Sequence, residues 1–263
     1  LANMEEAGLL HSVAGGVTIF DSNGDELSDR IYFADTGGQL WRVDLPGADL
    51  PDADQNTWRA VKIAEVNGGT ADTDRRFFNA PDVVRTAHTG AAFDAILIGS
   101  GDRTNPNDLD DPADPNDVAV QNQFYMFRDR AINPYFTDAP SAADCNADPP
   151  SVDFRCQLPL DPNDLYDVTP NLIQTGTADE QSAAQAALFA ASGWRLDLPN
   201  NGEKVLARSI TIAGRVYITT YTPTLVNENA CEPVSGLGRL YILNLFNAGA
   251  EVDFDNNGNT DRA

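Results

Sequence analysis

The chain has 263 residues, of which 42% are hydrophobic and 8% are aromatic. This apolar content is enough to form a core and excludes a wholly disordered protein. The formal net charge of −23 at pH 7 makes nucleic acid and anionic lipid poor partners. The longest apolar runs are far shorter than the roughly 18 residues of a membrane-spanning helix, so no membrane span is expected within the chain.

Most of the acidic residues are aspartates, with 31 Asp against 9 Glu. Short carboxylates suit turns and sites for hard cations better than they suit helix surfaces. A solvated surface adapted to salty water would produce the same composition, so both interpretations stay open.

Runs of β-branched and aromatic residues dominate the chain and predict an all-β protein. In chain order these runs are 31–33, 40–45, 95–98, 124–127, 209–212, 216–219 and 240–243. One segment, 179–191, is rich in Ala and Gln and predicts a short helix. Thr177 or Asp179 can cap its N-terminus, and the Ser-Gly pair at 192–193 ends it.

A weak repeat runs through the strands. The sequence GQLWRVDL at 38–45 resembles GRLYILNL at 238–245, and residues 122–127 and 193–198 fit the same pattern more loosely. Three of these four units follow a β-rich partner strand, at 30–34, 94–98 and 215–219. Hairpins repeated in this way, with long loop insertions between them, are typical of β-propeller blades. The alternative is a β-sandwich or a mixed sheet with accidental similarity.

The sharpest local motif is DSNGDELSD at 21–29. Side-chain oxygens stand at its positions 1, 3, 5 and 9, and a hard cation such as Ca²⁺ takes about six to eight oxygen ligands. An EF-hand would place a Glu at position 12, but position 12 lies inside a predicted strand. The motif therefore predicts a nine-residue calcium loop that leads directly into a strand, with an Asx-rich turn as the metal-free alternative. The expected ligands are Asp21, Asn23, Asp25, the carbonyl of Leu27, and Asp29.

A second candidate calcium loop, DFDNNGNTD at 253–261, ends the chain. Its oxygens stand at the same positions, and Gly258 occupies position 6, where a sharp turn favours glycine. An arginine follows each loop. A frayed terminus that leaves this site incomplete is the alternative. The expected ligands are Asp253, Asp255, Asn257, Asn259 and Asp261.

The three cysteines are Cys145, Cys156 and Cys231. The first two stand in an insertion rich in Pro, Asp and Asn, at 133–163. We expect them to form a disulfide that holds this loop, which favours an exported protein. Cys231 is left over, either free or paired outside the chain. Because the chain begins at Leu1 and shows no signal peptide, we expect it to be a processed or truncated piece.

Catalytic signals are weak, since no nucleophile-elbow, zinc-protease or phosphate-loop motif occurs. His11 and His88 are far apart in the sequence and near glycine turns, which favours surface or structural roles. The carboxylates of Asp108, Asp110, Asp111, Asp114 and Asp117 are expected to belong to a solvated loop, with cation binding as the alternative. We therefore expect a protein that is not an enzyme.

The segment IFDSNGDELSDRIYFADTGGQLWRVDL at 19–45 resembles the calcium loop and first strand of the PilC/PilY family of type IV pilus biogenesis proteins. Further stretches resemble the same C-terminal domain, in order, at 75–84, 96–106, 124–130, 164–174, 192–198, 202–223 and 238–245. The resemblance implies a modified, seven-bladed-type β-propeller that occupies 1–263 as the C-terminal part of a longer protein. The calcium residues that it carries over are those of the loop at 21–29.

The resemblance also implies a cellular location, partners and a regulatory function. Such a protein would be exported to the bacterial cell surface, at the pilus tip or outer membrane, with minor pilins and an unknown host or surface ligand as partners. Calcium would control pilus extension and retraction, and with them adhesion and twitching motility. Two alternatives stay open. A quinoprotein-like propeller dehydrogenase would commonly carry a vicinal cysteine pair, which this sequence lacks. A general calcium-dependent propeller lectin or adhesion module is the other.

Overall fold

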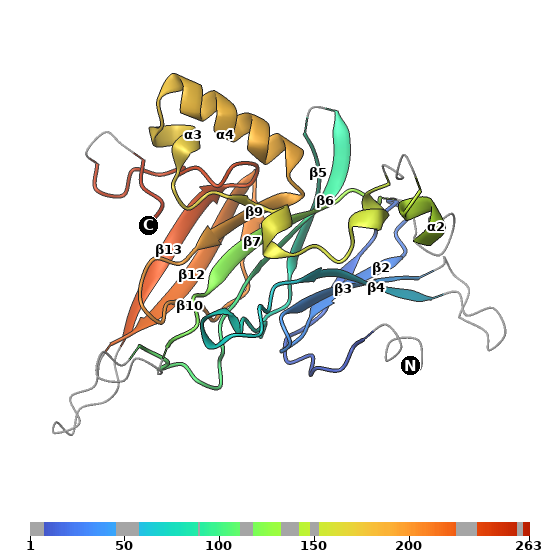
Figure 1. Cartoon of the computed structure of the whole chain (residues 1–263), viewed down its shortest axis with the longest axis horizontal. Helices are drawn as coiled ribbons and strands as arrows, with labels where there is room; N and C mark the ends of the chain where they lie inside the picture. The colour runs from blue at the N-terminus through green and yellow to red at the C-terminus, as the bar shows by residue number, and fades with distance from the viewer. Residues whose placement is uncertain are drawn as a thin grey trace.

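Three β-sheets make up most of the molecule (Figure 1). This computed structural model describes residues 8–45, 58–88, 90–110, 118–132, 142–147, 153–224, 236–256 and 260–263. Within these residues the sheets follow one another along the chain, and we call them the N-terminal, central and C-terminal sheets. The all-β class that the strand runs predict is confirmed.

Each sheet is mainly antiparallel. The N-terminal sheet has the order β1 (Thr18–Phe20), β2 (Arg30–Ala34), β3 (Gln39–Asp44) and β4 (Arg59–Glu65). The central sheet has the order β5 (Asp82–His88), β6 (Ala91–Gly99), β7 (Gln123–Asp129), β9 (Gly193–Asp197) and β8 (Tyr166–Asp167), and β8 runs parallel to β9. In the C-terminal sheet, β12 (Arg215–Pro223) pairs with β13 (Gly236–Asn244), β10 (Lys204–Val205) and β11 (Ile210–Ile212).

The predicted hairpins are confirmed. The repeat units at 38–45, 122–127 and 238–245 form the second strands of the hairpins β2–β3, β6–β7 and β12–β13. The fourth unit, 193–198, forms β9, which pairs with β7 inside the central sheet. This unit therefore extends an existing sheet and does not begin a sheet of its own.

The expected helix is α4 (Ala178–Ala190), which lies above the sheets in Figure 1. Thr177 is its N-cap: the hydroxyl accepts from the N–H of Glu180 at 3.4 Å, and the Glu180 carboxylate accepts from the N–H of Thr177 at 2.8 Å. The remaining helical segments are short, namely α2 (Ala142–Cys145), α3 (Leu172–Thr175), and the 3₁₀ turns η1 (Ala71–Thr73), η2 (Phe154–Gln157) and η3 (Pro162–Asp164).

The central sheet is buried on both faces, because side chains along a strand point alternately to opposite sides. In β7, Phe124 and Met126 pack in a cluster with residues of the C-terminal sheet. Tyr125 and Phe127, which alternate with them, pack in a second cluster with residues of the N-terminal sheet. The three sheets are therefore stacked face to face, with two hydrophobic cores between them.

The three described sheets do not by themselves establish the predicted β-propeller. Among the described residues, none of the three sheets closes into a barrel, and they do not form a complete ring of blades. The seven-bladed-type arrangement therefore stays a prediction.

The expected disulfide is present. Cys145 ends α2 and Cys156 lies in η2, and their Sγ atoms are bonded with the Cα atoms 5.3 Å apart. Phe154, also in η2, is buried in the cluster between the N-terminal and central sheets. The bond therefore holds the loop to a turn that is anchored in the core. Cys231 lies outside the described residues.

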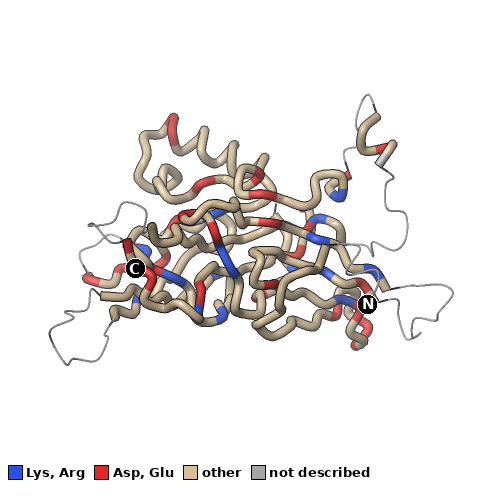
Figure 2. Tube along the Cα trace, turned by 60° about the horizontal axis from the view of Figure 1, so that its bottom comes forward, with Lys and Arg blue, Asp and Glu red and all other residues tan. Residues whose placement is uncertain are grey.

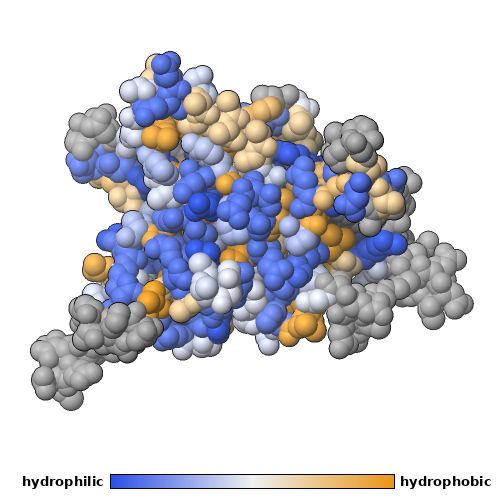
Figure 3. Space-filling view, viewed as in Figure 1, coloured by the Kyte–Doolittle hydropathy of each residue, from blue (hydrophilic) through white to orange (hydrophobic). Residues whose placement is uncertain are grey.

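Charged residues of both signs are interspersed along the described chain (Figure 2). The face shown in Figure 3 is mostly hydrophilic, with a more hydrophobic stretch over α4. In the part of the chain that the structure describes, no helix combines the length and the apolar character that crossing a membrane requires.

Candidate metal-binding loops

The first loop, 21–29, closes the hairpin between β1 and β2. Phe20 pairs with Arg30 at the end of the ladder, and the N–H of Asp29 donates to the carbonyl of Phe20 at 3.2 Å. The two ends of the loop are therefore held together by the sheet. The predicted ligand residues all lie in this one compact turn.

The carboxylate of Asp21, the first predicted ligand, gathers backbone amides of the loop. Its oxygens accept from the N–H groups of Gly24 at 2.7 Å, Glu26 at 2.9 Å and Asn23 at 3.3 Å. These bonds, above all that from Gly24, lower the pKa of Asp21 against the smaller opposing effect of burial. The side chain is therefore an anion that already organises the turn.

The next two predicted ligands continue the same pattern at a spacing of two. The Asn23 Oδ1 accepts from the N–H of Asp25 at 2.9 Å, and the Asp25 Oδ1 accepts from the N–H of Leu27 at 2.9 Å. The Asn23 Nδ2 also donates to the Asp25 Oδ2 at 3.1 Å. The loop is thus a series of Asx turns, as the metal-free alternative requires, built from oxygens that a hard cation also accepts.

Two left-handed residues make the sharp bend. Gly24, at position 4, has a φ of 79°, and Glu26, at position 6, has a φ of 72°. Position 6 is where calcium loops of the EF-hand type place glycine for the same reason. The backbone of the first loop therefore bends at position 6 as such a loop does, although its residue there is not glycine.

Asp29, the last predicted ligand, closes the loop through Ser22. Its two oxygens accept from the N–H of Ser22 at 2.8 Å and from its hydroxyl at 2.7 Å. Each carboxylate oxygen has a further lone pair, so these bonds leave capacity for a cation. Asp29 is thus a structural residue of the loop in addition to being a predicted ligand.

The second loop brings carboxylates together more closely than the first. Asp253, Asp255 and Asp261 place one oxygen each within 4.8 Å of one another, which is the only such acidic group of three among the described residues. Val252 and Asp261 form a bridge, with the N–H of Asp261 donating to Val252 at 2.8 Å. This part of the prediction is confirmed as an acidic group that could hold a metal ion. Asn257, Gly258 and Asn259 lie outside the described residues.

The arginine that follows each loop anchors it. After the first loop, Arg30 is buried and pairs with Asp94 at 2.6 Å and with Asp44 at 3.1 Å. After the second, the guanidinium of Arg262 donates to the carbonyls of Val168 at 2.7 Å and Ala248 at 3.1 Å. Both loops therefore end at a residue that is held by distant parts of the chain.

The pairing of Arg30 belongs to a buried network that sequence patterns did not reveal. Its charged members are Arg30, Arg42, Asp44, Asp94 and Asp129, each with 1% or less of the side chain exposed. Arg85 joins this network to the first loop, since it pairs with Asp94 at 2.5 Å and donates to the carbonyl of Ser22. No local motif marks the network as a whole, because Arg30 pairs with Asp94 and Arg42 with Asp129 across long stretches of the chain, although Arg42 and Asp44 are neighbours on β3.

The two histidines do not form a catalytic pair in the structure. His11 is exposed in the segment before β1, near Gly37. His88 ends β5, with its ring 5.2 Å from that of Phe246 and 6.1 Å from that of Phe189. Asp108 and Asp110, from the acidic insertion, accept backbone N–H bonds from Val120 and Ala119.

No family model matches the chain, and no curated protein matches its sequence. In structure, the chain is similar to the C-terminal domain of Pseudomonas aeruginosa PilY1, with a TM-score of 0.54 and 17% sequence identity. The similarity covers 94% of this chain and 51% of that chain, so this chain spans about half the length of that domain. The chain therefore shares the fold of about half of the PilY1 C-terminal domain, which confirms, for the fold, the resemblance that its sequence motifs indicate.

Proposed function

We propose that this chain is a calcium-binding interaction domain of a type IV pilus biogenesis protein and that it is not an enzyme. The observation that carries the proposal is the fold, which is similar to the PilY1 C-terminal domain over 94% of the chain. The sequence stretches that resemble the PilC/PilY family support the same assignment, because they are spread over most of the chain in order.

The architecture would be an open, modified β-propeller. The support is the face-to-face stacking of three sheets, each built on a hairpin from the same sequence repeat. In a propeller each blade packs on its neighbours in this way. The chain, 1–263, would be one domain of a longer exported protein, and the disulfide between Cys145 and Cys156 agrees with export.

Calcium would occupy both loops. The support is the donor chemistry: the predicted side-chain ligands are carboxylates and amides, which suit a hard cation, with no thiolate or imidazole among them. In the second loop, the carboxylates of Asp253, Asp255 and Asp261 would repel one another when no cation is present. In the first loop, the side chains of Asp21, Asn23, Asp25 and Asp29 would turn some of the oxygens that now accept from backbone amides toward the ion. The Leu27 carbonyl would be the fifth ligand.

Calcium in the first loop would act on contacts with the pilus machinery and not on a reaction. Asp29 leads directly into Arg30, whose side chain reaches the central sheet through Asp94. Calcium binding in the loop would therefore change how rigidly this edge of the molecule is held. The partners would be minor pilins at the pilus tip, at the bacterial cell surface, and the output would be pilus extension, retraction and surface attachment.

The test is to substitute Asp29→Ala in the full-length protein and to count surface pili and measure twitching motility. Ser22→Ala is the matched control, because it removes a hydrogen bond to Asp29 but leaves the carboxylate for the ion. We expect Asp29→Ala to fold, to lose calcium from the first loop and to change pilus number, and Ser22→Ala to stay close to the parent protein.

Metal content and loop protection are measured on the purified chain, by mass spectrometry of bound calcium and by hydrogen exchange with and without calcium. Normal pili in an Asp29→Ala protein that has lost this ion would refute the regulatory role. A calcium-independent exchange pattern at 21–29 would refute the ordering of the loop, even if the pili changed.

A further inference from the structure

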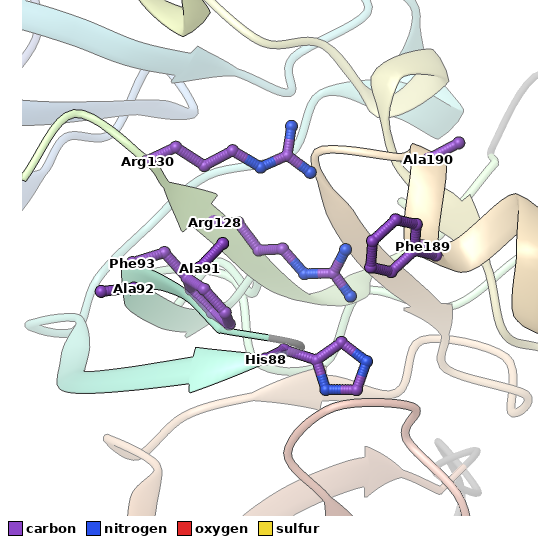
Figure 4. Close-up of a pocket in the computed structure, with 8 residues that line it drawn as sticks. All are labelled: His88, Ala91, Ala92, Phe93, Arg128, Arg130, Phe189 and Ala190. Atoms are coloured by element: carbon purple, nitrogen blue, oxygen red, sulfur yellow. The ribbon is translucent and has the colours of Figure 1, made fainter.

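A groove far from both acidic loops in the sequence lies between α4 and the β5–β6 hairpin (Figure 4). It consists of two hollows with cavity volumes of about 310 and about 460 Å³, and His88, Arg128 and Phe189 line both. Pockets for small organic ligands commonly have volumes of about 300 to 1,000 Å³. The groove therefore has room for a ligand of this kind.

Arg128, from β7, provides the charge in the groove. Only 5% of this residue is exposed, and its guanidinium points between Phe189 and His88 in Figure 4. Its Nη1 donates to the carbonyl of Leu188 at 2.9 Å and to that of Ala191 at 3.3 Å, both at the C-terminal end of α4. Its Nε is buried and has no partner.

This arginine has no carboxylate partner among the described residues, in a chain with a net charge of −23. The buried Arg30 and Arg42, by contrast, each pair with two aspartates. Burial, and after it the neighbouring charge of Arg130, lowers the pKa of Arg128 to about 10. A buried cation without a counter-charge is costly, so an anion that entered the groove would be stabilised.

Apolar and aromatic side chains line much of the rest of the groove, together with Arg130 in the first hollow and Ser182, Gln185 and Asn247 in the second. Phe93 lies under the Arg128 guanidinium, with 5.8 Å from the Cζ atom to the ring centre. Phe189 is 55% exposed at the end of α4, and the His88 ring faces it. Arg130 lines the same hollow and donates to the carbonyl of Ala191 at 2.9 Å. These contacts fix the cationic group in place before any ligand binds, which lowers the entropic cost of binding.

We propose that this groove is a binding site for a small organic carboxylate with an aromatic body, held by Arg128 and stacked against Phe189. The carboxylate would supply the counter-charge that Arg128 lacks, through the charge-assisted hydrogen bonds that guanidinium groups form with carboxylates. The aromatic body would cover the rings that line the groove. This site is separate from the calcium loops and does not depend on the proposed pilus function.

The test uses N-acetyl-L-phenylalanine as the probe and its neutral amide as the matched ligand, each titrated calorimetrically into the purified chain. The two differ in charge and hardly in shape. A hydrogen bond to a charged group contributes about 1.5–3 kcal/mol, so we expect the carboxylate to bind at least about tenfold more tightly than the amide. Inorganic phosphate, which has the charge without the aromatic body, is expected to bind more weakly than the probe.

Three variants locate the site. Arg128→Gln is expected to weaken probe binding at least about tenfold, and Phe189→Ala, which changes an exposed side chain, severalfold. Arg215→Gln is the control, since Arg215 is an exposed arginine paired with Glu251 elsewhere, and it should leave binding unchanged. Absence of saturable binding, equal affinity for acid and amide, or unchanged binding in both Arg128→Gln and Phe189→Ala would overturn the proposal. If Arg128→Gln does not fold, the proposal is tested by the affinity of Phe189→Ala for the probe and by the comparison of the acid with the amide.

Discussion

Arg30, the residue directly after Asp29, pairs with Asp94 of β6 across 2.6 Å, with 1% and 0% of the two side chains exposed. The pair joins the end of the first loop in the N-terminal sheet to the middle strands of the central sheet. Tyr32, two residues further along β2, donates its hydroxyl to the same buried carboxylates, at 3.1 Å to Asp94 or 3.0 Å to Asp129. The loop is therefore attached to a rigid, fully buried polar network and not only to its own hairpin.

Calcium is expected to stabilise the chain through the first loop. A ligand that binds only the folded state adds about 2.7 kcal/mol at a hundredfold excess over its Kd, so the melting temperature should be higher in calcium than in chelator. Asp21→Ala should remove the contribution of this loop. Glu26→Ala is the control, because it deletes a charge from the same loop at a position that is not a predicted ligand. Equal melting temperatures in calcium and chelator would contradict the prediction.

Substituting Asp94→Asn should destabilise the fold by about 3–5 kcal/mol, because it removes the buried carboxylate that pairs with both Arg30 and Arg85 and leaves Arg30 with Asp44 as its one remaining carboxylate partner. Chemical denaturation of the purified chain measures this loss. Asp197→Asn is the control, since its pair with Arg195 is partly exposed, and exposed pairs contribute about 0–1 kcal/mol. Similar losses in the two variants would show that the buried network has no special role.

The stability of the protein should fall in acid because of Asp94. Burial alone would raise the pKa of this carboxyl, but the hydrogen bond from Arg85 and the charge of Arg30 outweigh it and leave the pKa below the ordinary value of 3.8. The unfolded chain therefore takes up the proton at a higher pH than the folded chain. The contribution of Asp94 is fully present above about pH 4–5 and is lost as the pH falls through the lowered pKa. Denaturation between pH 6 and pH 3 should show a smaller loss in Asp94→Asn; an identical pH profile would exclude this group as the cause.

Replacing both Cys145 and Cys156 with Ser should cost about 3 kcal/mol or less, because the loop that the disulfide closes is short and the loss of chain entropy on closing it is modest. The measurement compares denaturation of the parent chain and the variant, each with and without reductant. Reductant should lower the stability of the parent to that of the variant and should leave the variant unchanged. Alkylation of both cysteines in exported, unreduced protein would argue against the bond.

Several features of this protein are determined by the sequence over short distances. The helix at 178–190 follows from an Ala-rich segment with Thr177 as its cap, one residue from the predicted start. The hairpins follow from β-rich runs that are neighbours in the chain, and the turn at 21–29 follows from Asp and Asn spaced by two. The bond between Cys145 and Cys156 spans only 11 residues. In each case the interacting groups are close in sequence, so local preferences are sufficient.

Only the tertiary structure decided how these pieces meet. The unit at 193–198 has the repeat pattern of a new blade, but β9 joins the central sheet by pairing with β7, a strand from a much earlier part of the chain. In the sequence, nothing distinguishes Asp94 from the other acidic residues, of which there are 40 in all. Its pairing with Arg30 exists only because two sheets pack against each other. Arg128 is set apart by the absence of an acidic partner among the described residues. Long-range packing selects such partners from many equivalent side chains, and no local pattern records that selection.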